Sequence, residues 1–213
     1  MSNILILAFL FFAGCLIGWG IEVIFRRFEP SNKARKWINP GFLIGPYLPL
    51  YGFGLCTLYL LAGLEKFIHT DNTALQKFIL FLLMAIAMTV IELIAGEIFI
   101  VKMHVKLWDY TGNKFNYKGI ICPLYSLIWA ALGAVYYFFI HPYILDALNW
   151  LANNLAFSFF IGFFYGVFAI DLFYSLKIAE KIKTFAEEND MVIRYEEFKR
   201  HICLLYTSPS PRD

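Results

Sequence analysis

The stretch ILILAFLFFAGCLIGWGIEVIF occupies residues 4–25, and Glu22 is its only charged side chain. A helix of about 20 predominantly apolar residues is long enough to cross the hydrocarbon core of a membrane. Four further apolar runs have this length, at Phe42–Leu64, Phe78–Val101, Ile120–Ile140 and Leu155–Leu176. All five runs are too long and too uniformly apolar for strands. The sequence therefore predicts an all-α integral membrane protein with about five transmembrane helices.

The composition supports this fold class. Of the 213 residues, 60% are hydrophobic and 16% are charged, and the mean hydropathy is +0.63. Soluble domains have roughly 45–50% apolar and about 25% charged residues. The net charge of +2 gives no reason to expect a nucleic-acid partner. The start, Met1-Ser2-Asn3, lacks the basic region of a signal peptide, so we expect the first run to remain in the membrane.

The positive charges divide unequally between the two sides of the membrane. The first and third connections and residues 177–202 hold fifteen Lys and Arg residues, whereas the opposite side holds two, Lys66 and Lys77. Because cytoplasmic loops are enriched in Lys and Arg, this bias predicts an outside N-terminus and a cytoplasmic C-terminus.

Two segments outside the runs have amphipathic character. His141–Asn154 is too short to span, and we expect an interfacial helix on the outer surface, held by Tyr143 and Trp150. The tail, residues 177–202, is predicted to be helical and cytoplasmic, with an apolar side made of Ile178, Ile182 and Phe185. Three roles stay open for it: docking on a partner, lying along the membrane, or simple solvation.

The last eleven residues, Cys203–Asp213 (CLLYTSPSPRD), match the conceptual translation of an adapter used in sequencing libraries. We interpret them as foreign to the protein and expect the natural chain to continue past Ile202. The transmembrane domain is accordingly expected at residues 1–176, followed by the tail at 177–202.

The chain also repeats itself weakly, over residues 4–64 and 78–140. Each half carries the same order of motifs: Glu22, Trp37, Asn39, Gly41 and Pro49-Leu50-Tyr51 in the first, and Glu97, Trp108, Asn116, Gly119 and Pro123-Leu124-Tyr125 in the second. Two spans per unit predict parallel copies. The alternative is chance matching of common residues.

Proline and glycine crowd the start of the second span in each half. Pro46 and Pro49 fall in the first half and Pro123 in the second. Proline inside a helix breaks it, and interrupted helices at matching places in two repeats indicate a binding site. A proline in the first turn of a helix is tolerated, which accounts for Pro123 but not for both Pro46 and Pro49.

Four carboxylates lie within the apolar runs, and all fall in the predicted cytoplasmic half. Glu22 can pair with Arg26, while Glu97 and Asp171 have a lysine five or six residues away. Glu92 lies deepest, about 14 Å from the inner end of its helix, so we expect it to face the bundle. Gly96, four residues on, would allow a neighbouring helix to approach closely.

The third connection is dense in aromatic and hydrogen-bonding side chains. It contains Trp108, Asp109 and Asn116, and Asp109 is placed to cap a turn through Thr111 or Gly112. Two interpretations stay open: a folded loop that plugs the cytoplasmic mouth, or a direct contact with a ligand.

Several functional classes find no support. The sequence lacks a Gly-x-x-x-x-Gly-Lys-Ser/Thr motif, so it has no ATP-binding P-loop, and its four histidines are scattered. Cys15, Cys56 and Cys122 lie in apolar runs and are interpreted as small packing residues. We therefore expect neither enzymatic activity nor a cofactor.

The chain resembles the bacterial family of type IV ABC-transporter permeases. The matching motifs, between Gly14 and Trp129, are Gly18-Trp19 with Glu22, Asn39-x-Gly41-Phe42-Leu43-x-Gly45-Pro46-Tyr47-x-Pro49-x-Tyr51-Gly52-x-Gly54, Glu92-Leu93-x-x-Gly96, Trp108-Asp109-Tyr110, Phe115-Asn116 and Gly119. The family commonly has arginine where this chain has Pro40, so any role of that arginine has no counterpart here. The resemblance implies a permease of the bacterial cytoplasmic membrane that works with a separate ATP-binding subunit. Five spans are few for a permease, so either a homo-oligomer or further sequence beyond the residues given would be needed.

These observations lead to one hypothesis and one alternative. The hypothesis is a permease whose substrate or ion site lies between the two repeats, formed by Glu22, Asn39, Pro46, Pro49, Tyr51, Glu92, Glu97, Trp108, Asp109 and Asn116. The alternative is a membrane protein that does not transport: a scaffold, a sensor or a small membrane enzyme whose loops bind a partner.

Overall fold

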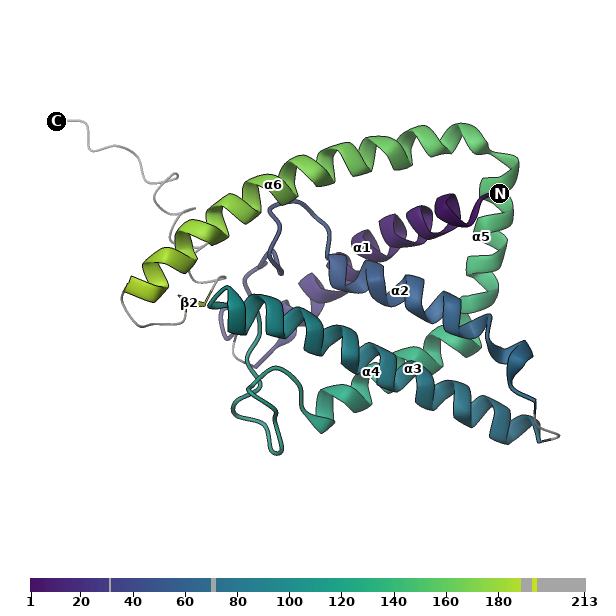
Figure 1. Ribbon diagram of the computed structural model, residues 1–213, viewed down its shortest axis with the longest axis horizontal. Helices are drawn as coiled ribbons and strands as arrows, with labels where there is room; N and C mark the ends of the chain where they lie inside the picture. Colours follow the sequence, from purple (N-terminus) through teal and green to yellow (C-terminus); the bar gives the residue numbers. More distant parts are fainter. Residues whose placement is uncertain (31, 70–71, 189–192, 195–213) are drawn as a thin grey trace.

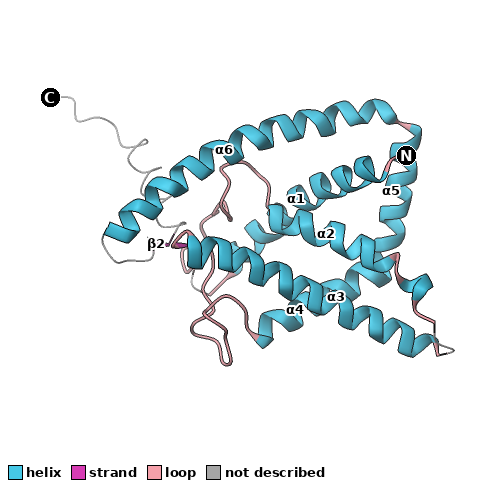
Figure 2. Ribbon diagram, viewed as in Figure 1, coloured by secondary structure: helices cyan, strands magenta, loops and turns pink. Residues whose placement is uncertain are grey.

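The computed structural model describes residues 1–30, 32–69, 72–188 and 193–194. Helices dominate these residues, which confirms the all-α class (Figure 2). The α-helices are α1 (Asn3–Phe28), α2 (Pro49–Ala62), α3 (Thr73–Gly96), α4 (Pro123–Val135), α5 (His141–Asn153) and α6 (Ser158–Glu188). Short 3₁₀ turns, η1 (Glu65–Phe67) and η4 (Leu155–Phe157), and π-helical turns, η2 (Glu97–Lys102) and η3 (Tyr136–Ile140), extend or connect them. The segment Cys203–Asp213 lies outside the described residues.

Four helical stretches are long and apolar enough to cross a membrane. They are Asn3–Phe28, Thr73–Lys102, Pro123–Asn153 and Leu155–Thr184, and they contain most of the first, third, fourth and fifth predicted spans. The prediction for Phe42–Leu64 is wrong in its first part, because the helix begins only at Pro49. At about 1.5 Å per residue, the 14 residues of α2 measure about 21 Å, less than the roughly 30 Å of a hydrocarbon core.

The helices form two adjacent pairs and one long flanking helix. Helix α2 packs on α1 and on α3, and α3 packs on α4, so α2 and α3 join the two pairs. Helix α6 runs along the α1 side and packs against α1 (top of Figure 1), while α5 crosses the end of the bundle and leads from α4 back to α6.

Small residues allow α1 and α2 to cross closely. A Cβ atom on Gly14 would lie 2.8 Å from the Tyr51 carbonyl oxygen, and one on Gly52 would lie 2.6 Å from the Cys15 sulfur. Gly18 faces the Tyr51 side chain with no room for a methyl group. Gly96 is packed in the same way against Ile120, but Ile120 lies in the connection before α4, so the segment that approaches this glycine is not the expected helix.

Helix α6 continues through residue 177, where the tail was expected to begin, and ends at Glu188. Its last turns are not free, because Ala179 and Ile182 are buried in one apolar cluster with Leu43 and Val105. Strand β1 (Val105–Lys106) pairs in parallel with β2 (Ile193–Arg194). The side chain of Phe185 and residues 195–202 of the predicted tail lie outside the described part of the chain.

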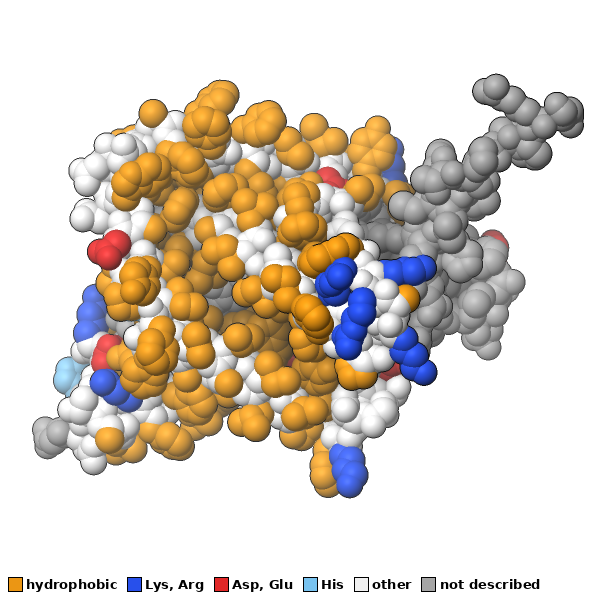
Figure 3. Space-filling view, turned by 180° about the vertical axis from the view of Figure 1, so that it is seen from behind, with side chains coloured by type: hydrophobic (Ala, Val, Ile, Leu, Met, Phe, Trp, Pro, Cys, Tyr) orange, Lys and Arg blue, Asp and Glu red, His pale blue; other side chains and the backbone are white. Residues whose placement is uncertain are grey.

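The surface is that of a membrane protein. Apolar side chains cover the middle of the face in Figure 3, and charged side chains gather toward its two ends. Large apolar residues are exposed along the outer sides of the spans, among them Phe78, Ile86 and Ile94 in α3 and Phe159, Phe163 and Ile170 in α6. In water such a surface would aggregate, whereas in a bilayer it contacts lipid.

Candidate functional site

Glu22 joins the two helices of the first pair. Its Oε1 accepts a hydrogen bond from Arg26 Nε at 2.8 Å, and its Oε2 accepts one from the Tyr51 hydroxyl, also at 2.8 Å. Arg26 also reaches the carbonyl oxygen of Leu107 at 3.4 Å. The expected pairing with Arg26 is therefore present, but Glu22 is at the same time bound to the N-terminal turn of α2.

Glu92 is the buried carboxyl group of the bundle. Its side chain lies on α3, and the residue is 2% exposed. The Tyr110 hydroxyl donates to Oε1 at 2.8 Å, and the Trp129 indole lies close enough to interact with the carboxyl group. Oε2 has no partner with good hydrogen-bond geometry among the described residues. The expectation that Glu92 faces the bundle agrees with this placement.

The two carboxylates belong to one cluster. Glu22 and Glu92 each interact electrostatically with Tyr51 and with one another. The Tyr51 ring lies 5.5 Å from that of Trp129, between centroids, which closes the gap between α2 and α4. We call the set of Glu22, Arg26, Tyr51, Glu92, Tyr110 and Trp129 the Glu22–Glu92 cluster.

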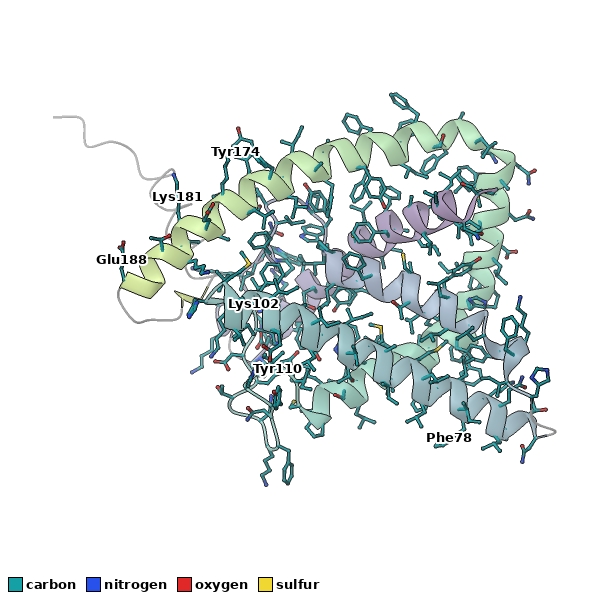
Figure 4. All side chains as sticks on the ribbon, viewed as in Figure 1. Phe78, Lys102, Tyr110, Tyr174, Lys181 and Glu188 are labelled. Carbon is teal, nitrogen blue, oxygen red and sulfur yellow. The ribbon has the colours of Figure 1, made fainter. Side chains whose placement is uncertain are left out.

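Both Pro-Leu-Tyr motifs reach this cluster from matching places. Pro49 and Pro123 each occupy the first turn of a helix, α2 and α4 respectively. Tyr51 binds Glu22, and the Tyr125 ring stacks on Tyr110 with centroids 4.0 Å apart. Figure 4 shows Tyr110 where the third connection meets the helices. The N-terminal turns of α2 and α4 therefore adjoin the same group of carboxylates.

Glu97 does not join the cluster. It opens the π-helical turn η2, and its Oε1 accepts a hydrogen bond from Lys118 at 2.8 Å in a partly exposed ion pair. The repeat predicts Glu97 as the counterpart of Glu22, yet Glu92 is the residue that shares the buried site with Glu22. Five residues correspond to about 140° around a helix, which points the two side chains of α3 in different directions.

The third connection is held by its own polar side chains. Asp109 accepts hydrogen bonds from the Thr111 amide and hydroxyl and forms an ion pair with Lys106 at 3.0 Å. Burial raises the pKa of Asp109, but the bonds from Thr111 and then Lys106 outweigh it and lower the pKa to about 2. Trp108 donates its indole N–H to the Ile120 carbonyl at 2.8 Å.

Asn116 closes the same loop. Its amide donates to the Asn113 and Thr111 carbonyls, and its side-chain oxygen accepts from the amide of Gly119. Gly119 has a φ of +69°, which an L side chain rarely adopts. Trp108, Asp109 and Asn116 therefore order the loop that presents Tyr110 to Glu92.

The segment before α2 is irregular, and Asn39 organises it. The Trp19 indole donates to Asn39 Oδ1 at 2.7 Å, and the Asn39 amide donates to the Ile44 carbonyl at 2.7 Å. Pro46 lies in this non-helical segment and Pro49 at the start of α2, so neither proline interrupts a helix.

Asp171 holds this segment and was missing from the predicted site. From α6 it accepts bonds from the amides of Ile44 and Gly45, at 3.2 and 2.7 Å, and from the Tyr47 hydroxyl at 2.7 Å. The Ser175 hydroxyl donates to it at 2.9 Å. The only sequence signal was its position as the single carboxylate of an apolar run.

Comparison with known proteins places this arrangement in a family. A sequence-family model described as "putative ABC-transporter type IV" matches residues 9–176. The chain belongs to this family. Neither the curated proteins nor the solved structures gave a match.

The type IV family match covers every residue of the Glu22–Glu92 cluster and Asp171, and it ends inside α6. The chain is thus a membrane protein of a transport-related family. Among the described residues, no group of three or more His, Cys, Asp or Glu side chains is placed to hold a metal ion.

Proposed function

We propose that this chain is the permease component of a transport system, that it works with a separate ATP-binding subunit, and that its polar site is the Glu22–Glu92 cluster. The observation that carries the proposal is Glu92, a carboxyl group almost fully buried in a bundle of membrane-spanning helices. Ionisable groups at membrane depth are costly, and they mark substrate and ion pathways.

The location of the cluster supports a role in transport. It receives side chains from α1, α2, α3, α4 and the third connection, so a movement between the two helix pairs would change it. The N-terminal turns of α2 and α4 bring the positive ends of two helix dipoles beside the carboxylates. Helix N-termini directed at a polar site within the membrane are typical of transporter sites.

The proposed orientation follows from the distribution of Lys and Arg. Arg26 belongs to the cluster, Lys106 pairs with Asp109 in the connection that carries Tyr110, and the connections on that side carry most of the positive charge. The cluster would then lie in the cytoplasmic half of the membrane, with the N-terminus outside. Because the chain has no P-loop, ATP would be hydrolysed by another subunit. The few spans and the exposed apolar sides favour a homo-oligomer.

One observation favours the alternative, a scaffold or sensor. Phe115 is 89% exposed on the ordered third connection, and Lys114 and Lys118 flank it in the sequence. An exposed aromatic side chain on a rigid loop suits contact with a partner. A permease would use the same loop to contact its ATP-binding subunit, so the identity of the partner separates the two functions.

The experiment is purification of the tagged chain from its native membrane under mild detergent. The proposal predicts an equimolar P-loop subunit that hydrolyses ATP, and Phe115→Ser should weaken its retention. The matched control is Phe159→Ser, at an exposed position of α6 far along the chain. A monodisperse chain that lacks any ATP-binding subunit would overturn the proposal in favour of the scaffold or sensor.

A further inference from the structure

The Glu22–Glu92 cluster holds fewer positive than negative groups. The groups that face Glu92 are Glu22 and Arg26 from α1, Tyr51 from α2, Tyr110 from the third connection, and Trp129 from α4. Tyr125 lies behind Tyr110, and Glu29 acts on Tyr125 at the outer edge. Within the cluster, one guanidinium therefore serves two carboxyl groups.

Arg26 is committed to Glu22 by geometry. Its Nε lies 2.8 Å from Glu22 Oε1, and its Nη2 is directed to the backbone oxygen of Leu107. Glu92 receives neutral donors only: the Tyr110 hydroxyl donates to Oε1 with good geometry, and the Trp129 indole lies near the carboxyl group without making a well-aligned bond to Oε2. An ionised Glu92 would thus be a buried anion whose nearest charged neighbour is another carboxylate.

The ionised and the neutral forms of Glu92 differ in the free energy that it takes to bury them. If it is ionised, Oε2 carries negative charge in a buried place with no well-aligned hydrogen bond and with only the neutral Trp129 indole nearby, which is far more costly than burying a neutral carboxyl group. If it is neutral, Oε1 still accepts from Tyr110, and Oε2 carries the proton. The unpartnered oxygen is the one that would hold it.

We propose that Glu92 is a proton-binding site, loaded at neutral pH, with the proton on Oε2. Binding takes one proton from water at the cytoplasmic end and changes the charge of Glu22, Arg26 and Glu92 together from −1 to 0. Release reverses this step and requires that water or a cation reach Oε2. The use of the proton in transport rests on the proposed function, whereas its presence on Glu92 does not.

The test is infrared difference spectroscopy of the purified chain in lipid nanodiscs, titrated with pH in H₂O and in D₂O. The wild type is expected to show the carbonyl band of a protonated carboxylic acid at pH 7, to shift it in D₂O and to lose it at higher pH. Glu92→Gln should lack this band. Glu97→Gln, which removes a partly exposed carboxylate of the same helical stretch, should keep it.

Two further variants separate the proposal from a folding defect. Tyr110→Phe removes the donor that stabilises the ionised carboxylate, so the band should persist to higher pH by about one unit. Glu22→Gln leaves Arg26 to compensate Glu92, so the band should be lost at lower pH. Opposite shifts support the proposal because misfolding would not give them.

Two results would overturn the inference: a wild-type spectrum at pH 7 without the band, or a band that survives in folded Glu92→Gln. Neither would touch the proposed partnership with an ATP-binding subunit, since the nanodiscs contain the chain alone. Conversely, if Glu92 is protonated in a chain that binds no such subunit, the proton site stands and the proposed permease function is rejected.

Discussion

Asp171→Asn should release the irregular segment before α2 from α6. Each carboxylate oxygen accepts two hydrogen bonds, from Ile44 and Ser175 on one side and from Gly45 and Tyr47 on the other. An asparagine has one accepting oxygen, so one backbone amide loses its acceptor whichever way the side chain is turned, and the three remaining partners exchange a charged acceptor for a neutral group. At about 1.5–3 kcal/mol for a hydrogen bond to a charged group, the loss is about 3–5 kcal/mol.

This loss is large enough to open the segment locally. A domain is stable by about 5–15 kcal/mol, so the remaining helices should stay folded. Leu43 is 1% exposed in the cluster that the segment forms with α6. A maleimide should therefore label Leu43→Cys at least about 100-fold faster when Asp171→Asn is present. The comparison is made in a background whose native cysteines are replaced by alanine.

The matched control is Asp146→Asn, which removes an exposed aspartate of α5 that is distant in sequence from the segment. It should leave the labelling rate unchanged, and circular dichroism should show the same helix content in all variants. Equal labelling of Leu43→Cys with and without Asp171→Asn would refute the argument that this carboxylate holds the segment.

Three further predictions test other parts of the account. Gly18→Ala should lower the unfolding free energy by about 1–3 kcal/mol, because the added methyl group meets the Tyr51 side chain. Gly20→Ala, which has open space around it, should leave the unfolding free energy unchanged or raise it by up to about 1 kcal/mol. Denaturant titration in detergent compares the two variants. Tyr51→Phe should cost about 1.5–3 kcal/mol in the same titration through the lost bond to a carboxylate, and an unchanged midpoint would contradict it. Because the pKa of Asp109 is lowered from 3.8 to about 2, its contribution to stability is complete above about pH 4 and is lost as the pH falls toward 2. After a reduction for solvent screening, Asp109→Asn should remove about 0.5 kcal/mol of the difference in unfolding free energy between pH 5 and pH 3, and a variant with the wild-type pH dependence would count against the interpretation.

The fold class was predictable because hydrophobic length alone decides it. Four of the five apolar runs become helices of spanning length, since nothing else satisfies the backbone of a long apolar run in lipid. Hydrophobic length gave the wrong prediction for residues 42–48, which are not helical. They are apolar, but their backbone bonds go to Asp171 and to the Cys15 carbonyl, and a hydropathy average cannot register such partners.

The sequence predicted the buried carboxyl group of the candidate site, but it did not predict the aromatic side chains that contact it. Glu92 could be predicted because a carboxyl group deep in an apolar helix is costly to bury and is usually retained for a function. Tyr110 and Trp129 lie 18 and 37 residues further along the chain, and only helix packing brings them to Glu92. Glu97 was included because it is a carboxylate in an apolar run and the repeat matches it to Glu22, although the helix turns it toward Lys118.

The most direct test of the proposed function is whether activity depends on the carboxyl group of Glu92. Glutamine is neutral and has nearly the same shape as a protonated glutamate, so Glu92→Gln should preserve the folded protein while it removes the group that binds and releases the proton. The measurement is ATP hydrolysis per folded complex in lipid vesicles that contain the chain and its ATP-binding subunit, for wild type, Glu92→Gln and Glu97→Gln. The account predicts a loss of about tenfold or more for Glu92→Gln at unchanged thermal stability, and wild-type activity for Glu97→Gln. A Glu92→Gln variant that lowers only the amount of folded protein, with full activity per complex, would contradict it.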